Sequence, residues 1–241
     1  MKVFAISDLH LSFKDRVIPG EWEKAEEYKP MNIFGDKWEK HYYHLYKNWL
    51  KLVEEDDLIL LPGDISWATT MEELEPDLDF INLLPGQKVF VKGNHDYWWQ
   101  RIGQLRAVFP ENCYLIQNDS VSFGRIGVAG SRGWTVPNRI SFTERDEKIY
   151  KRELIRLQLS LDSLPADTEY KIVLLHYMPV NEEHQHNELI EILEDYQVDL
   201  CIYGHLHGEG AHANRLEGKK WGVDFRLVSA DFLNFTPVRI L

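Results

Sequence analysis

Short apolar segments that end abruptly in polar residues recur along this chain. Five of them read as buried strands followed within three residues by aspartate, asparagine or histidine, and they cover residues 2–6, 58–61, 89–91, 171–175 and 199–203. Continuous apolar runs of this length are typical of strands that are covered on both faces. The pattern therefore predicts one polar site, built where five buried strands end.

Helical periodicity fills the stretches between these strands. Apolar residues at helical spacing predict helices over residues 36–55, 70–84, 98–109, 144–163 and 182–196. Asp36 and Thr70 are the expected N-caps of the first two helices. Further short strands are expected at 114–117, 120–123, 125–130, 225–229 and 238–241. Alternating strands and helices indicate an α/β fold with helices on both faces.

An irregular aromatic segment follows the first strand. It covers about residues 13–35 and includes Trp22, Tyr28 and Phe34. A long loop directly after a strand that carries site residues is a plausible wall or lid over a pocket. We interpret it as an aromatic loop insertion within a single domain over residues 1–241, because no linker or internal repeat divides the chain.

The charge of the chain restricts the partners that we expect. The formal net charge is −12, and no run of lysine or arginine provides a basic patch, so neither double-stranded nucleic acid nor a membrane is an expected partner. The segment before Asp8 is too short for a signal-peptide core, which makes the cytoplasm the expected location. Cys113 and Cys201 lie in apolar runs and are interpreted as core residues.

The polar residues at the strand ends form a consistent set of metal ligands. They are eight oxygen and imidazole donors without a thiolate, namely Asp8, His10, Asp64, Asn94, His95, His176, His205 and His207. Imidazole with carboxylate favours divalent Mn, Fe, Zn or Co. Eight donors exceed the needs of one ion and suit two ions that share a carboxylate. Such a pair can hold the attacking and leaving oxygens of a phosphate ester during hydrolysis.

These residues occur in blocks with a fixed order. The blocks are Asp8-x-His10, Gly63-Asp64, Gly93-Asn94-His95-Asp96, His176 and Gly204-His205-x-His207. In this order, each after an expected strand, they resemble the calcineurin-like metallophosphoesterases. The resemblance implies an α/β sandwich of two sheets flanked by helices, in four layers α/β/β/α. It also implies a dinuclear metal site at the C-terminal ends of the strands, where a metal-bound hydroxide attacks a phosphate ester.

The resemblance also implies a role for each residue. Three residues would hold the first metal ion, namely Asp8, His10 and His207. Three others would hold the second ion, namely Asn94, His176 and His205, and Asp64 would bridge the two ions. His95 would protonate the leaving oxygen or stabilise charge on the phosphoryl group, and Asp96 would orient the His95 imidazole. An amide such as that of Asn94 coordinates through its carbonyl oxygen, which agrees with this assignment.

Two functions from different classes remain open. The first is a phosphohydrolase acting on a small phosphate ester, with phosphodiesters slightly favoured over monoesters. Aromatic residues that could stack a nucleobase or an aryl group support this preference, namely those of 22–34, Trp67, Tyr97, Trp98 and Trp134. The second is a catalytically silent metal-binding scaffold for protein–protein interaction. The complete set of ligands favours the enzyme.

Several polar residues outside the blocks have no clear part in this chemistry. Arg132 stands between small residues after an expected strand and could meet an anionic ligand, although a surface turn is the simpler interpretation. His212 follows the last block closely, and Asp231 lies near the C-terminal end. We interpret His212 as structural and Asp231 as a turn residue.

Overall fold

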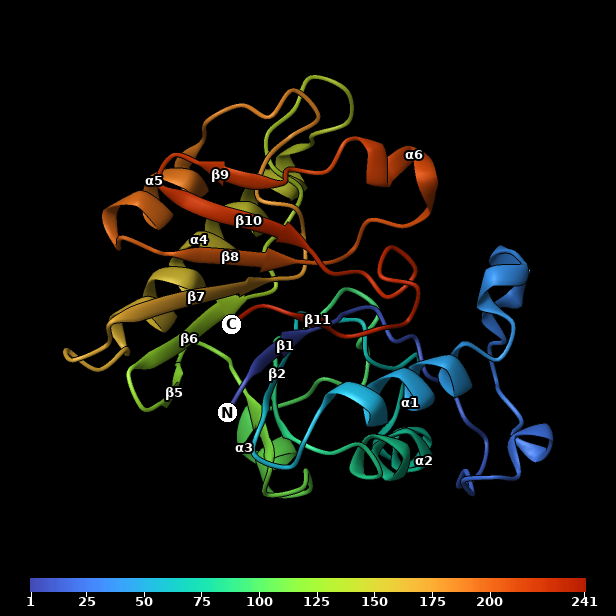
Figure 1. The fold of residues 1–241 in the computed structure, drawn as a ribbon. Helices are drawn as coiled ribbons and strands as arrows, with labels where there is room; N and C mark the ends of the chain where they lie inside the picture. The colour runs from blue at the N-terminus through green and yellow to red at the C-terminus, as the bar shows by residue number, and fades with distance from the viewer.

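Two mixed β-sheets form the framework of the computed structural model, which describes residues 1–241 (Figure 1). The first sheet has the order β11-β1-β2-β3-β4, with β1 at Val3–Ala5, β2 at Leu58–Leu61, β3 at Gln87–Phe90, β4 at Cys113–Leu115 and β11 at Val238–Arg239. The second has the order β5-β6-β7-β8-β10-β9, with β5 at Val121–Phe123, β6 at Ile126–Ser131, β7 at Tyr170–Leu175, β8 at Leu200–Tyr203, β9 at Gly218–Lys220 and β10 at Val223–Leu227.

Helices cover the outer face of each sheet (Figure 1). The helices are α1 at His41–Leu52, α2 at Met71–Asn82, α3 at Ile102–Arg106, α4 at Glu144–Asp162, α5 at Glu188–Asp195 and α6 at Gly208–Ala213. The helices α1 and α2 lie on the first sheet, and α4 and α5 lie on the second. None of the helices has the length and apolar character needed to cross a membrane.

The central strands are buried on both faces, as their apolar runs predict. In β1, Val3 and Ala5 join a core between the two sheets, whereas Phe4 joins the core beneath α1 and α2. In β7, Ile172 and Leu174 join the same inter-sheet core. Successive side chains of a strand point to opposite faces, so each strand contributes to two cores. This arrangement confirms the predicted sandwich of two sheets flanked by helices.

Parallel pairing brings the C-terminal ends of the strands to one edge. The strands β1 to β4 run parallel, and so do β6, β7, β8 and β10. The two sheets meet at this edge, because the Ser7 amide donates to the carbonyl oxygen of Val228 at 2.8 Å and the Ala230 amide donates to that of Ser7 at 3.0 Å. Residues that follow strands of either sheet are therefore neighbours.

Several helix boundaries differ from those predicted. The stretch 98–109 forms only the short helix α3, because Trp98 and Trp99 are held in the core by their indole N–H groups, which donate to Asp96 and Gln117. The helix α1 begins at His41 and not after Asp36, because Lys40 has a left-handed backbone with a φ of 45°. The helix α6 and the strand β9 were not predicted.

The aromatic segment 13–35 is anchored to the first helical layer. Its start is held by the buried Asp77 carboxylate of α2, which accepts the amide of Phe13 at 2.8 Å. Trp22 packs on Tyr46 of α1 with ring centroids 4.8 Å apart. The segment extends beyond the edges of the sheets in Figure 1. Its later part returns toward the C-terminal ends of the strands, so that Met31 and Phe34 border a pocket described below.

Candidate metal centre

The three predicted ligands of the first metal ion lie together. They come from two sheets, since Asp8 and His10 follow β1 and His207 follows β8. His10 Nε2 lies 3.1 Å from His207 Nε2, which lies 3.4 Å from Asp8 Oδ1. One carboxylate oxygen and two imidazole nitrogens are thus directed at one point.

The three predicted ligands of the second metal ion form a neighbouring group. Asn94 Oδ1 lies 2.7 Å from His176 Nε2, and His205 Nδ1 lies 3.2 Å from the same nitrogen. These residues follow β3, β7 and β8. The loop after β8 therefore contributes one histidine to each group, as the resemblance to the metallophosphoesterases implies.

Two carboxylates connect the groups. Asp64 Oδ2 lies 3.4 Å from His176 Nε2 in the second group and 4.0 Å from His10 Nε2 in the first. Asp8 also lies within 4.8 Å of Asp64 and His176, and all three are buried. Asp64 thus occupies a position between the groups, where a bridging ligand is expected.

The donor spacing fits divalent ions of the predicted kind. Metal–nitrogen bonds to such ions are about 2.0–2.1 Å long, so neighbouring ligands of one ion lie about 3 to 3.4 Å apart. The two ring nitrogens of the first group, at 3.1 Å, match this spacing. A cluster of buried imidazoles and carboxylates facing each other would be costly without a cation.

Four of these residues have unusual backbone conformations. Asp8, His10, Asp64 and His205 have φ angles of 58°, 48°, 52° and 69°. Residues other than glycine rarely adopt this left-handed region, and such strain concentrates at functional sites. Hydrogen bonds between neighbouring loops stabilise these backbone conformations. One of them runs from the Asp8 amide to the carbonyl oxygen of Gly63 at 3.0 Å. The strain supports a functional site rather than a fortuitous cluster.

Two positions in the sequence blocks require glycine, because neighbouring loops pass too close for a side chain. A Cβ atom at Gly204 would overlap the side chains of Ser7 and Asp8. A Cβ atom at Gly93 would overlap the backbone amide and carboxylate of Asp64. Glycine therefore precedes His205 and Asn94 because the ligand-bearing loops touch at these points.

The buried carboxylates of the site favour the binding of cations. Burial lowers the pKa of His176, but Asp64 and Asp8 outweigh it and raise this pKa to about 9. Burial likewise lowers the pKa of His207, but Asp231 and Asp8 raise it to about 10. Burial raises the pKa of Asp64, but His176 lowers it to about 2. The ionised carboxylates thus hold protons on two imidazoles, and bound metal ions would displace these protons.

The other two ligand histidines are neutral. Burial lowers the pKa of His10 to about 3 and that of His205 to about 4, in spite of the nearby carboxylates. Neutral imidazole is the form that coordinates a metal. These two rings are therefore ready to act as ligands at neutral pH.

The outer ring nitrogens of two ligand histidines are held by acceptors. His176 Nδ1 lies 3.0 Å from the carbonyl oxygen of Pro62, and His207 Nδ1 lies 3.0 Å from Asp231 Oδ1. Because these oxygens only accept, each Nδ1 carries the hydrogen and Nε2 faces the site. This arrangement is usual for histidines that bind metals.

Asp231 is the functional residue that the sequence did not reveal. It follows β10 and is not a simple turn residue, since its other oxygen accepts the Gly208 amide at 3.0 Å. His212 Nε2 lies 3.4 Å from the same oxygen and also borders the pocket. The pairing of the two sheets at Ser7 brings Asp231 next to His207. The only sequence signal for this residue is the mostly apolar run 227–230, which ends at Asp231 as the runs before the other site residues end at theirs.

Replacing Asp231 with alanine should weaken metal binding by the first group. Loss of the acceptor frees the His207 ring, and loss of such a partner typically lowers metal affinity about 10- to 100-fold. Metal content at increasing chelator concentrations measures the effect. Asp224→Ala is the control, because this half-buried aspartate of β10 pairs with Arg226 away from the site. Equal metal retention by both variants would contradict the positioning role.

His95 lies beside the two groups but is not among their clustered nitrogens. Its ring centroid is 4.1 Å from that of Trp67, and its Nδ1 is 3.2 Å from the Tyr97 hydroxyl. The His95 backbone amide donates to Asp64 Oδ1 at 2.8 Å. Burial lowers the pKa of the ring, which favours neutral imidazole.

Asp96 has a different environment from the one expected. Its buried carboxylate accepts the amides of Gly93 at 2.7 Å, Asp64 at 3.0 Å and Ile65 at 2.9 Å. It therefore ties the ligand-bearing turns after β2 and β3 together. The His95 ring instead contacts Tyr97, so Asp96 positions the backbone of the site and does not touch this imidazole.

A pocket of about 470 Å³ opens over the first group of ligands. His10 and His207 border its inner end, together with His95. Its walls include Phe34 from the aromatic segment and Trp67 from the turn after β2. Trp67 stacks on His10 with ring centroids 5.0 Å apart. The pocket thus has aromatic walls and ends at the candidate metal ligands. We call it the aromatic pocket.

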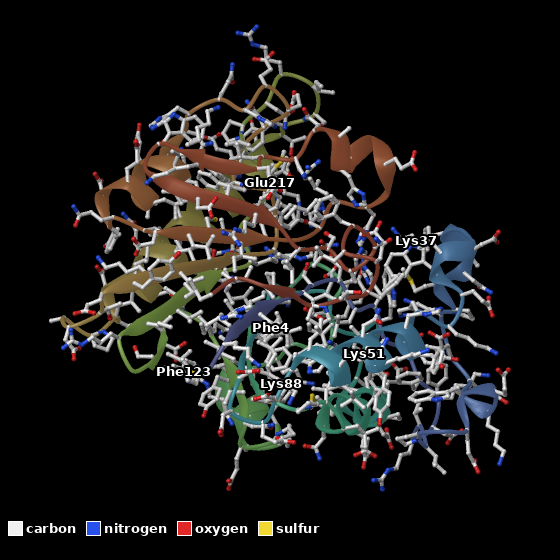
Figure 2. All side chains as sticks on the ribbon, viewed as in Figure 1. Phe4, Lys37, Lys51, Lys88, Phe123 and Glu217 are labelled. Atoms are coloured by element: carbon white, nitrogen blue, oxygen red, sulfur yellow. The ribbon has the colours of Figure 1, made fainter.

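Lys37 closes one side of this pocket. Its ammonium group donates to the carbonyl oxygen of Asp231. Figure 2 shows Lys37 between the segment that precedes α1 and the loop that follows β10. The residues just before α1 and the loop that follows β10 are therefore joined beside the site.

The other aromatic residues proposed as substrate contacts have mixed positions. Trp98 is fully buried and stacks on Phe109, so it is a core residue and the prediction for it was wrong. Trp134 packs against Arg132 and Tyr177, away from the aromatic pocket. Tyr97 is exposed beside His95.

Comparison with known proteins identifies the family of this chain. A family model for calcineurin-like phosphoesterases matches residues 1–209, and the chain belongs to this family. We found no match to it among curated proteins. A crystal structure of a protein of unknown function from Aquifex aeolicus aligns over 99% of this chain and 95% of its own, with 16% sequence identity and a TM-score of 0.48. The family membership indicates metal-dependent hydrolysis of phosphate esters.

Proposed function

We propose that the protein is a dinuclear metal-dependent phosphohydrolase that prefers phosphodiesters carrying an aryl or nucleoside group. The observation that supports it most strongly is the arrangement of two adjacent ligand groups with Asp64 between them. The first ion would be held by Asp8, His10 and His207. The second would be held by Asn94, His176 and His205.

The metal ions and the protein side chains would have separate roles in the reaction. Two bound divalent ions lower the pKa of a water molecule and neutralise charge on the phosphate. Asp64 keeps the two groups close, and Asp231 and Pro62 fix the ring orientation of His207 and His176. His95 would donate a proton to the leaving oxygen or stabilise negative charge beside the ions.

The aromatic pocket supports the preference for a diester with an aromatic group. Phe34 and Trp67 offer flat apolar surface next to the first ligand group. The one lysine that lines the pocket, Lys37, is bonded to a backbone carbonyl oxygen. A monoester carries a second negative charge on the phosphate, for which these walls provide no further cation.

Metal content together with turnover tests the proposal. The purified protein would be assayed with bis-p-nitrophenyl phosphate and p-nitrophenyl phosphate, before and after chelation and after addition of Mn²⁺. We expect about two ions per chain, turnover that the chelator abolishes, and faster cleavage of the diester. Bound metal without turnover of any phosphate ester would favour the scaffold function instead.

Replacing Phe34 with alanine tests the aromatic pocket. Phe34 lines the pocket without contacting a site histidine, whereas Trp67 packs on two of them. We expect KM for an aryl diester to rise by up to about tenfold, since an aromatic contact contributes about 0.5–1.5 kcal/mol. The KM for a dialkyl diester should stay unchanged. Ile33→Ala is the control, because Ile33 is exposed and does not line the pocket. An equal rise for both substrates would exclude stacking on Phe34.

A further inference from the structure

A second polar pocket lies at the same edge of the sheets, and we call it the basic pocket. Its charged lining residues are Lys92 after β3, Arg132 after β6, and Glu153 and Arg156 on α4. Its volume is about 30 Å³, which accommodates a small ionic group and not a whole ligand. No part of the chemistry described above uses it.

The basic pocket has more positive charge than its own carboxylate can balance. Glu153 is buried, and its Oε1 accepts from Arg156 Nη1 at 2.8 Å and from Arg132 Nη2 at 3.5 Å. Lys92 is half-buried, and its ammonium group has no hydrogen-bond or ion-pair partner within the protein. Glu153 is thus the only carboxylate that lines the pocket beside three cations, and the buried Asp96 acts on Lys92 from outside the pocket.

Several polar atoms in the pocket lack partners. Arg132 Nε is a buried donor without a hydrogen bond, which an anion would satisfy, whereas Glu153 Oε2 is a buried acceptor without a donor, which an anion would not. Unpaired charge of this kind destabilises a folded protein unless a ligand compensates for it. It is also unexpected in a chain whose formal net charge is −12.

Contacts of Arg132 link the basic pocket to the second group of metal ligands. The carbonyl oxygen of Arg132 accepts the His176 amide at 3.0 Å. The Arg132 guanidinium lies 4.5 Å from the Trp134 ring, which packs on Tyr177, and Tyr177 packs on His205 with centroids 4.2 Å apart. The aromatic pocket adjoins the first ligand group, so the two pockets flank the candidate metal centre.

We propose that Lys92, Arg132 and Arg156 form a subsite for a second anionic group, a phosphate or a carboxylate. The substrate would then be a phosphate ester with an apolar or aromatic group on one side and an additional oxyanion on the other. This substrate assignment rests on the proposed phosphohydrolase function, whereas anion binding by the basic pocket does not. Arginine and lysine donors arranged around one point are suited to such oxyanions.

Lys92→Met is the sharpest variant for a test, because Lys92 has no partner to lose. Without an anion, this change should raise the melting temperature, since it removes repulsion between Lys92 and the two arginines. A lysine with a purely structural role would give the opposite shift. Lys148→Met is the matched control, because Lys148 is exposed on α4 and forms no ion pair.

Sulfate is the first probe, with ionic strength held constant by sodium chloride. Melting temperatures of the metal-loaded protein should rise with sulfate for the wild type and for Lys148→Met. For Lys92→Met the apparent dissociation constant of sulfate should increase about tenfold or more, as loss of a charged hydrogen bond implies. The same sulfate response in Lys92→Met and the wild type would overturn the proposal, as would no response in the wild type.

A pair of substrates identifies the source of the anion. For methyl phenyl phosphate, a diester without a further charge, Lys92→Met should leave KM unchanged. For a phenyl diester whose alkyl group carries a carboxylate, the same variant should raise KM about tenfold if the subsite holds the substrate. Unchanged KM for both, with weakened sulfate binding, would identify a free oxyanion as the ligand. Absence of turnover of any phosphate ester by the wild type, bis-p-nitrophenyl phosphate included, would refute the phosphohydrolase function, while the sulfate experiment would still decide whether the basic pocket binds anions.

Discussion

Asp64→Asn is expected to remove both metal ions together and to lower kcat about a thousandfold or more. Asp64 Oδ2 faces His176 of one ligand group and His10 of the other, at 3.4 Å and 4.0 Å. The substitution removes one negative charge from between the two ions. Such ions contribute several kcal/mol to transition-state stabilisation, and each 1.36 kcal/mol corresponds to a tenfold change in rate.

The fold should survive the Asp64→Asn change. The asparagine oxygen can still accept the His95 amide, which Asp64 Oδ1 accepts at 2.8 Å. Asp57→Asn is a suitable control, because Asp57 is a buried aspartate that accepts the Lys2 amide at 2.6 Å, far from the site in the first sheet. Metal content per chain is the decisive measurement. Loss of one ion with full retention of the other would deny Asp64 the bridging position.

His95→Ala is expected to retain both metal ions and to lower kcat about a hundredfold or more. His95 lies beside the ligand groups, and its ring contacts Trp67 and Tyr97. A positioned general acid or base typically contributes about 10²- to 10⁴-fold to the rate. We therefore expect a decrease in kcat without a matching decrease in metal content.

The choice of substrate sharpens the His95 experiment. An ester with a good leaving group such as p-nitrophenol needs little protonation, so the loss should be larger for an alkyl leaving group. His44→Ala is the control, because His44 is exposed on α1 outside the site. If metal content and activity of His95→Ala fell in proportion, His95 would be a ligand and not an acid.

The strand pattern was the most informative part of the sequence. Runs such as 58–61 and 200–203 are apolar at every position, and both are buried strands with parallel neighbours on either side. Because parallel strands are covered on both faces, continuous apolar character identifies them without knowledge of their neighbours. The polar residues after them follow directly, which is why the ligands Asp64 and His205 could be recognised.

Elements that depend on long-range contacts were less predictable. Residues 98–109 have helical spacing, yet Trp98 donates to the buried Asp96 and only Ile102–Arg106 forms a helix. The resemblance to the family implies that Asp96 orients the His95 ring. Its carboxylate instead accepts amides from the turn after β2, a partner more than 30 residues away.

By itself, the sequence determined the class of fold, the polar blocks at the strand ends and the kind of ions that they suit. These follow from local patterns, since burial and ligand chemistry are properties of single residues and short runs. Only the tertiary structure decided that Asp231 accepts a hydrogen bond from His207, that Phe34 borders the site and that Lys92 and Arg132 line one pocket. Each of these contacts joins residues far apart in the chain, and the packing of two sheets at one edge creates them.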